Sequence, residues 1–316
     1  MNPRHKKFLK VILPLVIGGL LVWYLFTIIP PETLLEYFKN ANYWWIALGL
    51  LFGVLSHFSR AYRWKFILEP MGYKPRFVNS TLAVLIGYFV NIAIPRAGEI
   101  SRATVMTNYE SIPFEKGFGT IVAERIADLI MMFVIIIITL FFQFDFIYTL
   151  LIENFNPIKI SIVLLTIAVG FFIFLSFIKR AKSGILLKIK NFIISLIDGV
   201  SSIFKMKKKW AFIFHTVFIW VLYVLMFWAT IPAIKGLHVP FGGILVGFIA
   251  GGLSIAATNG GVGLYPIAVA TAFNLFGVAE EPSLAFGSVM WSAQTAMIII
   301  FGGLAFLLLP IYNKAA

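Results

Sequence analysis

Apolar runs of about 20 residues recur along this chain, and they constrain its fold more than any other feature. A helix of about 20 apolar residues is just long enough to cross the hydrocarbon core of a bilayer. Of the 316 residues, 60% are hydrophobic and only 12% are charged, whereas soluble domains are about 25% charged. A soluble core of this size cannot bury so much apolar surface. The sequence therefore predicts an all-α polytopic membrane protein and excludes a soluble enzyme.

Six segments are predicted to be full membrane spans: 8–29, 43–68, 117–143, 158–178, 210–232 and 284–309. Two further apolar stretches are interrupted by turn-forming residues. The stretch 77–108 breaks at the run IPRAGE, and the stretch 241–276 breaks at the run TNGGVG. Loop charges do not distinguish full spans from re-entrant hairpins in these stretches, so the sequence predicts six spans plus two re-entrant hairpins or, alternatively, eight spans. The short, polar second arm of the first stretch favours hairpins, whose unwound tips need a protein-lined or wet cavity.

Loop charges predict the orientation. Lys and Arg dominate at the N-terminus and in residues 60–76 and 179–209, whereas the other loops hold six acidic residues against three basic ones. By the positive-inside rule the basic loops face the cytoplasm. We therefore expect a multi-pass protein of the cytoplasmic (inner) cell membrane with both termini cytoplasmic. Contact with anionic lipid headgroups, rather than nucleic acid, explains the net charge of +13.

The order of the predicted segments suggests an internal repeat. The first half reads span, span, cytoplasmic hairpin, span, and the second half repeats that order with every direction reversed. Such an inverted-topology repeat places a transporter's substrate site where discontinuous helices meet near the midplane. We predict one membrane domain, 1–316, with 1–143 as the first half, 144–181 holding the first span of the second half, and 210–316 as the remainder. Residues 182–209 predict an amphipathic connector in the inner interface or, alternatively, a docked cytoplasmic helix.

The break in the first stretch carries the first candidate site: Arg96, Gly98, Glu99 and Arg102. Charged residues at membrane depth are costly, so each is a functional hypothesis. The two guanidinium groups suit bidentate binding of a phosphate, and Gly98 allows a tight turn. The alternative is a hairpin tip held by its own salt bridge, without a ligand.

A second charged cluster lies early in the predicted span 117–143 and contains Glu124, Arg125 and Asp128. Glu124 and Asp128 are four residues apart on one helix face, and Arg125 can reach Asp128. We expect these groups to pair within the bundle, with Arg96 or Arg102 as partners. Either carboxylate is a candidate proton site, and the alternative is a purely structural ion-pair network.

The break in the second stretch forms the third candidate site, with Asn259, Gly260, Gly261 and Gly263. Three glycines in four positions permit an unwound backbone that approaches another group closely. Because no strand precedes them and no Lys follows, they do not form a nucleotide P-loop. They either line a cavity opposite the first break or make a tight packing turn.

The sequence offers no catalytic constellation. The absence of Cys excludes disulfides, zinc–thiolate sites and Cys nucleophiles, and the four His residues are scattered. We therefore expect no catalytic residues, no metal and no cofactor.

Two of these clusters resemble a known family. The run GYFVNIAIPRAGEISRA (Gly87–Ala103), followed by VAERIADLI (Val122–Ile130), resembles the transmembrane region of lysylphosphatidylglycerol synthases, the flippase-like domain of the multiple peptide resistance factor. The resemblance is to the stand-alone form, without the soluble aminoacyl-transferase domain. It places the family's motifs on the first two clusters and on the glycine run, but Pro266 stands where the family has a late Glu.

The resemblance implies translocation of a membrane lipid and no aminoacyl transfer. We expect a flippase for a phospholipid or lipid-linked phosphate, with aminoacylated phosphatidylglycerol, another phospholipid and a polyprenyl phosphate as candidates. Arg96 or Arg102 is expected to bind the phosphate. The alternative is a non-transporting membrane subunit that scaffolds a separate lipid-modifying or glycosyl transferase.

Overall fold

The computed structural model describes residues 16, 18–146, 148–149, 206–258 and 260–314, with isolated residues between 162 and 190. The predicted span 158–178 and the connector 182–209 lie largely outside the described residues, and Asn259 lies entirely outside them. Within the part described, every regular element is a helix, as the sequence predicts.

A helix over Gly18–Ile28 comes first. The following helices are α2 (Pro31–Asn40), α3 (Tyr43–Leu68), η1 (Glu69–Met71), α4 (Phe77–Ala93), α5 (Ala97–Glu110), α6 (Phe114–Phe142), α10 (Lys209–Thr230), η2 (Ile231–Ala233), α11 (Phe241–Ala257), α12 (Leu264–Asn274) and α13 (Glu280–Lys314).

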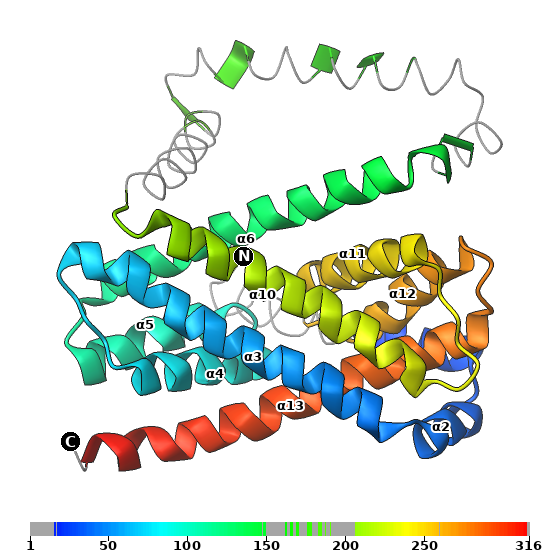
Figure 1. Cartoon of the computed structure of the whole chain (residues 1–316), viewed down its shortest axis with the longest axis horizontal. Helices are drawn as coiled ribbons and strands as arrows, with labels where there is room; N and C mark the ends of the chain where they lie inside the picture. The colour runs from blue at the N-terminus through cyan, green and yellow to red at the C-terminus, as the bar shows by residue number, and fades with distance from the viewer. Residues whose placement is uncertain are drawn as a thin grey trace.

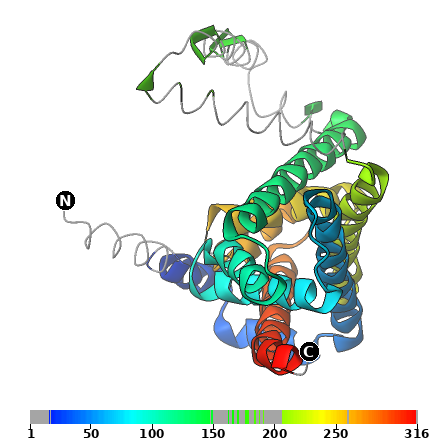
Figure 2. The same cartoon turned by 90° about the vertical axis from the view of Figure 1, so that its left-hand side faces the viewer.

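Helices α3 and α10 lie side by side and antiparallel along one face of the bundle (Figure 1). Polar contacts connect the two helices or their flanking residues at both ends of the molecule. At one end the backbone N–H of Asn42 donates to the carbonyl of Ala233 at 2.9 Å. At the other end Lys208 Nζ lies 2.7 Å from Glu69 Oε2, and this contact lowers the pKa of the Glu69 carboxyl. Helices α6 and α13 lie on opposite sides of the bundle (Figures 1 and 2).

The two interrupted stretches are helical hairpins that start from opposite ends of the molecule (Figure 1). The α4–α5 hairpin turns at Arg96, whose φ is +65°, and the α11–α12 hairpin turns through glycines at positive φ. Helices α5 and α12 have 14 and 11 residues, so they measure about 21 and 16 Å. Both are shorter than the bilayer core of about 30 Å.

Each of the two long outer helices contacts one helix from each hairpin. Helix α13 packs on α12 and α4, and α6 packs on α5 and α11. Close approach requires glycine at two points on α13. A Cβ added at Gly287 would lie 2.6 Å from Pro266 Cα, and one at Gly302 would lie 2.9 Å from the Leu85 carbonyl oxygen. The hairpins are therefore held from two sides.

We expect Gly302→Ala to destabilise the protein because its new methyl group would collide with the α4 backbone, and overpacking of this kind costs about 1–3 kcal/mol. Gly303→Ala is the matched control, since a Cβ there meets nothing within 4 Å. In detergent, Gly302→Ala should lower the melting temperature while Gly303→Ala leaves it unchanged or raises it. Equal melting temperatures for the two variants would contradict the described α13–α4 contact.

The described helices match three of the six predicted spans by length and composition. Three of them are long and apolar enough to cross a membrane: α6, Lys209–Ala233 and α13. The Gly18–Ile28 helix and α2 add a fourth if they form one broken span, bent by 84°. Residues 30–42, predicted as a loop, hold helix α2, because Pro31 starts a helix well and one of its faces is apolar.

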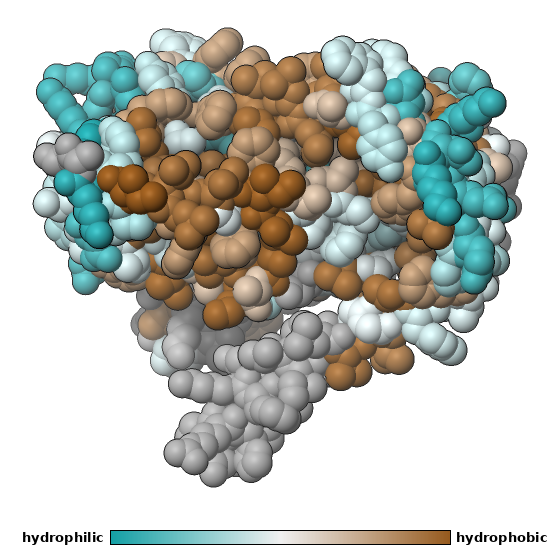
Figure 3. All heavy atoms as spheres, turned by 90° about the horizontal axis from the view of Figure 1, so that it is seen from below, coloured by the Kyte–Doolittle hydropathy of each residue, from teal (hydrophilic) through white to brown (hydrophobic). Residues whose placement is uncertain are grey.

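Helix α3 matches the predicted span 43–68 in its bounds but is not among the apolar helices just named. Its second half carries buried polar residues, which are Ser56, His57, Ser59, Arg60 and Arg63. A helix with such residues needs protein rather than lipid around that face. Figure 3 shows an apolar band between more hydrophilic groups at the two ends of the molecule.

Candidate functional site

A cavity of about 1040 Å³ lies in the middle of the bundle, and both hairpin tips reach it. Pro95 and Arg96 line it from the α4–α5 turn, and Thr258 and Gly260 line it from the α11–α12 turn. The remaining wall comes from the four hairpin helices and from α3, α6, α10 and α13. The two sequence breaks, more than 150 residues apart, thus meet at one site.

The charged part of the cavity lies deep along the helices. Asp128 lies 14 residues from either end of α6, which places it about 21 Å from each. Arg60 lies eight residues before the end of α3. These side chains are therefore far from the polar ends of the bundle.

Asp128 is shared by three arginines. Its carboxylate lies 2.6 Å from Arg60 Nη1, 3.3 Å from Arg63 Nη1 and 3.6 Å from Arg125 Nη1. Arg60 also donates to the Tyr223 hydroxyl at 3.2 Å, and Arg63 donates to Thr216 Oγ1 at 2.9 Å. One carboxylate thus joins α3 to α6, and the α3 arginines reach α10 as well.

The remaining charges on the wall are Arg96 and Glu99. Glu99 Oε1 lies 3.4 Å from Arg125 Nε, so Glu99 pairs with α6 rather than with its neighbours in sequence. Arg96 is exposed to the cavity and forms no ion pair with any residue that the structure describes. Its positive φ places a strained, charged residue at the hairpin tip.

Arg102 and Glu124 form a separate pair that does not line the cavity. Arg102 Nη2 lies 3.0 Å from Glu124 Oε2, and both side chains are almost completely buried. The Arg102 guanidinium lies over the Trp64 ring at 4.2 Å, and Trp64 donates to Thr120 at 2.8 Å. This pair joins α5, α6 and α3 behind the cavity wall.

The glycines of the two tips serve mostly in packing. Gly98 is buried against α4, and its N–H donates to Asn91 Oδ1 at 2.7 Å. Of the second tip, Gly260 lines the cavity and its carbonyl accepts from Trp291 Nε1 at 2.8 Å. A Cβ at Gly263 would lie 2.6 Å from Leu21 Cβ, on the first helix, and one at Gly261 would lie 3.1 Å from Tyr265 Cβ.

Much of the cavity lining is apolar. The large apolar side chains in it are Met132, Trp220, Met226, Phe227, Phe248, Met290, Trp291, Met297 and Ile298. Such a cavity can hold a charged group and a hydrocarbon segment of one molecule together.

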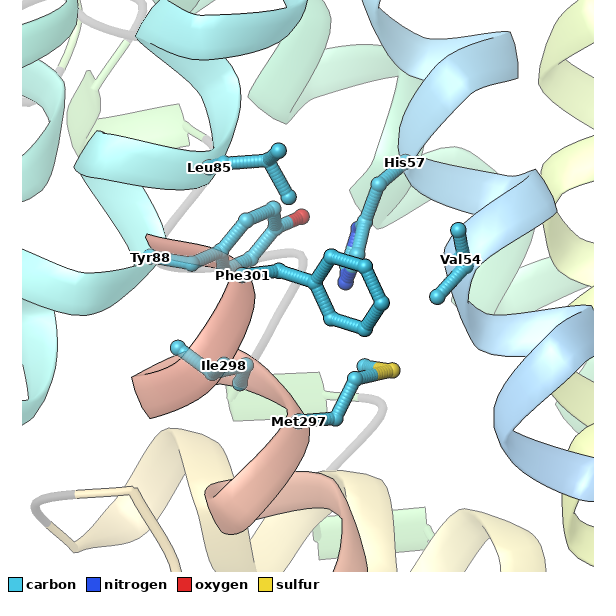
Figure 4. Close-up of a pocket in the computed structure, with 7 residues that line it drawn as sticks. All are labelled: Val54, His57, Leu85, Tyr88, Met297, Ile298 and Phe301. Atoms are coloured by element: carbon cyan, nitrogen blue, oxygen red, sulfur yellow. The ribbon is translucent and has the colours of Figure 1, made fainter. Parts of the chain in front are cut away.

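A small recess of about 10 Å³ adjoins the cavity between α3, α4 and α13. Figure 4 shows His57 facing Tyr88, with Phe301 beside them. The His57 and Tyr88 rings lie 4.5 Å apart, and neither ring nitrogen of His57 has a hydrogen-bond partner among the described residues. The recess barely admits one water, and it is apolar, so it is a packing defect rather than a ligand site.

The structure brings together the charged groups that sequence reasoning proposed, but with different partners. Arg125 reaches Asp128 as expected, and Arg102 pairs with Glu124. Asp128 pairs instead with Arg60 and Arg63, which the sequence presents equally well as interfacial anchors. The spacing of His57, Arg60 and Arg63, three residues apart on one helix face, is the signal that finds them. No comparable signal points to Tyr88 and Tyr223.

Among the described residues, no group of three or more His, Asp and Glu side chains is arranged to hold a metal ion. The polar wall is built from guanidinium, carboxylate, phenol and amide groups. Guanidinium and phenol groups in such a wall can donate hydrogen bonds to an anion.

Comparison with known proteins gives a family match along nearly the whole chain. The family model described as the lysylphosphatidylglycerol synthase TM region matches residues 11–303. A UPF0104 membrane protein of Methanocaldococcus jannaschii is 31% identical over 125 residues, which cover 39% of this chain and 37% of that protein. The glycosyltransferase AglD of Haloferax volcanii is 27% identical over 131 residues, 41% of this chain and 21% of that protein. The chain thus matches well under half the length of these relatives, and no solved structure matches it.

Proposed function

Because the chain belongs to the lysylphosphatidylglycerol synthase transmembrane-region family and is a multi-pass membrane protein, we propose that it is a lipid flippase of the cytoplasmic membrane. It moves a phospholipid or a lipid-linked phosphate from one leaflet to the other. The headgroup enters the cavity while the chains stay in lipid or along the apolar wall. No aminoacyl transfer is part of this proposal.

One observation carries the proposal: the cavity is large, is reached by the tips of both hairpins, and is lined by arginines together with many apolar side chains. A lipid phosphate is a strong bidentate partner for a guanidinium group. Arg96, Glu99, Arg125 and Asp128 all contribute to this wall. A protein that only scaffolds a partner gains nothing from charges kept at this depth, where each is costly.

The packing pattern supports an inverted repeat as the framework for this movement. Exchanging α3 with α10, α4–α5 with α11–α12, and α6 with α13 turns most of the described helix contacts into one another. For example, the α5–α6 and α12–α13 contacts exchange, as do α4–α13 and α11–α6. In such transporters, rocking of one half against the other exposes a fixed central site to each side in turn. The hairpins are then re-entrant, one from each leaflet.

We propose that the end of the bundle holding Lys207 and Arg76 faces the cytoplasm and that the end holding Lys235 faces outward. The chain has no native Cys, so single cysteines report cleanly. An impermeant maleimide added to intact cells should label Lys235→Cys but should label Lys207→Cys only after the membrane is opened. Labelling of Lys207→Cys in intact cells would reverse the orientation.

Lipid translocation in proteoliposomes tests the function, and a plug in the cavity tests its route. Ala256 is exposed and lines the cavity, so the indole of Ala256→Trp occupies space that a headgroup needs. We expect wild-type protein to move fluorescent phospholipid analogues to the accessible leaflet faster than protein-free liposomes do. The protein-dependent rate of the Ala256→Trp variant should be at least tenfold lower than that of the wild type.

Ala93→Trp is the matched control, because Ala93 is also exposed near a hairpin tip but does not line the cavity. It should keep a rate close to that of the wild type. The flippase proposal fails if wild-type protein, folded and correctly inserted, adds nothing to the rate of empty liposomes for any lipid class tested.

The similarity to part of AglD, a protein named as a glycosyltransferase, favours one second candidate. In that case the chain is a membrane subunit that presents a lipid-linked substrate to a separate transferase. This candidate predicts lipid binding at the cavity without translocation, so the same liposome assay separates the two.

A further inference from the structure

The charges around the cavity do not balance. Three arginines, Arg60, Arg96 and Arg125, line the cavity, and Arg63 shares Asp128 from behind the lining. Among the described residues only two carboxylates, Glu99 and Asp128, compensate these four positive charges. The buried Arg102–Glu124 pair is neutral by itself and adds nothing to this balance. The wall thus carries two positive charges more than negative ones among the described residues.

An excess of two charges is costly where the surroundings are apolar, because Coulomb repulsion grows as the effective dielectric constant falls. Three of these guanidinium groups share the single carboxylate of Asp128 within 3.6 Å. Arg96 has no carboxylate within ion-pair distance among the described residues. A bound anion with two negative charges would compensate this excess, whereas an anion with one charge would leave half of it.

We propose that the headgroup held in this cavity is a terminal phosphate monoester, a dianion, rather than a phosphodiester or a zwitterion. This inference rests on the proposed function, because it names the class of lipid that the same cavity takes. A phosphate monoester carries close to two negative charges at neutral pH and three acceptor oxygens. A phosphodiester headgroup carries only one negative charge.

The unpaired hydrogen-bonding atoms of the wall match an acceptor-rich ligand. Arg60 Nε and Trp220 Nε1 are buried donors with no acceptor among the described residues, and both side chains line the cavity. The Tyr88 and Tyr223 hydroxyls lie 3.5 Å apart, so when one donates to the other, the second keeps a free hydrogen. Phosphate oxygens satisfy such donors, each as a charge-assisted hydrogen bond.

One atom favours the competing zwitterionic headgroup. Glu99 Oε2 is buried and has no hydrogen-bond partner in the part of the chain that the structure describes, so its free lone pairs suit an ammonium group. However, a zwitterionic headgroup carries no net charge and leaves the positive excess of the wall unchanged, and Arg125 already lies 3.4 Å from the other oxygen of Glu99. The charge balance therefore favours the dianion.

The apolar part of the cavity lining identifies the ligand as a lipid rather than a free phosphate. Met132, Phe248 and Met290 lie on the same lining as the arginines. A water-soluble phosphate gains nothing from these side chains, whereas the first segment of a hydrocarbon chain buries against them. Glycerolipid and polyprenyl monophosphates share the headgroup, and the assay compares both chain types.

The test is a competition experiment in which lipids bind to the full-length protein in detergent. Native mass spectrometry measures how much of each lipid is bound. The glycerolipid probes are phosphatidic acid, phosphatidylglycerol and phosphatidylethanolamine with identical acyl chains, and a polyprenyl monophosphate and inorganic phosphate complete the set. At pH 8 we expect phosphatidic acid to bind at least tenfold more tightly than phosphatidylglycerol or phosphatidylethanolamine. The polyprenyl arm shows which chain is preferred, and inorganic phosphate at equal concentration should not compete.

Two further comparisons separate the cavity from general surface charge. Lowering the pH to 5 adds a proton to the monoester, whose second pKa is about 6, and should reduce the preference over phosphatidylglycerol. Arg96→Gln should reduce the preference to about threefold or less, because it removes one of the two excess charges. Lys74→Gln removes an exposed charge outside the cavity and should leave the preference unchanged.

Equal binding of phosphatidic acid and phosphatidylglycerol, tighter binding of phosphatidylethanolamine, or an equal loss of preference in Lys74→Gln would overturn the inference. None of these results depends on transport. A protein that prefers the monoester but moves no lipid would overturn the flippase proposal alone. One that moves lipids with no preference for a monoester would overturn this inference alone.

Discussion

Replacing Asp128 by Asn is expected to lower the stability of the protein by about 3–5 kcal/mol, the usual cost of breaking a buried ion pair by removing one partner. The reason is that Arg60, Arg63 and Arg125 share this one carboxylate, at 2.6, 3.3 and 3.6 Å. An amide keeps the shape and some hydrogen bonding but leaves Arg60 and Arg63 without a carboxylate and Arg125 with Glu99 alone. The melting temperature of purified protein in detergent measures the effect.

Asp145→Asn is the matched control for this variant. Asp145 lies three residues beyond the end of α6 and is exposed, so the same chemical change there should leave the melting temperature nearly unchanged. Arg63→Met added to Asp128→Asn should recover part of the loss, because it removes one of the uncompensated charges. If Asp128→Asn melted within about a degree of the wild type, the three-arginine cluster would not contribute to the folded state as described.

The second large effect is expected at the buried pair of Arg102 and Glu124. Both side chains are at most 3% exposed and lie 3.0 Å apart, so Arg102→Gln or Glu124→Gln alone strands a buried charge and should cost about 3–5 kcal/mol. The double variant leaves two neutral amides that can hydrogen-bond to each other. Its loss should be smaller than the sum of the single losses by about 1–3 kcal/mol.

The double variant also decides between the two roles that the sequence allows for Arg102. Because neither side chain lines the cavity, the folded double variant should translocate lipid within about threefold of the wild-type rate. If Arg102 holds the lipid phosphate, that variant should fold but lose transport. Melting temperature and translocation must therefore be measured on the same preparations.

The amino-acid pattern predicts where most of the described helices lie and where the two interrupted stretches break. The predicted span 117–143 ends one residue beyond α6, and the breaks in 77–108 and 241–276 coincide with the two hairpin turns. Both features depend on local sequence. Glycine and proline interrupt a helix where they stand, and the length of an apolar run indicates whether that segment can cross a membrane. Helix α2 was not predicted, because a short amphipathic helix between two bends has the composition of a polar loop.

The sequence by itself determined which residues share a helix face and that charges lie at membrane depth, since both follow from spacing along one helix. Only the tertiary structure decided which charge each of them meets. Asp128 and Arg60 are 68 residues apart, and nothing in the spacing of either helix specifies that α3 presents its arginines to α6. The same packing separates Arg96, which lines the cavity and has no ion-pair partner among the described residues, from Arg102, paired behind the wall. Helical periodicity gives a side chain its direction, but the group that it contacts depends on how the other helices pack around it.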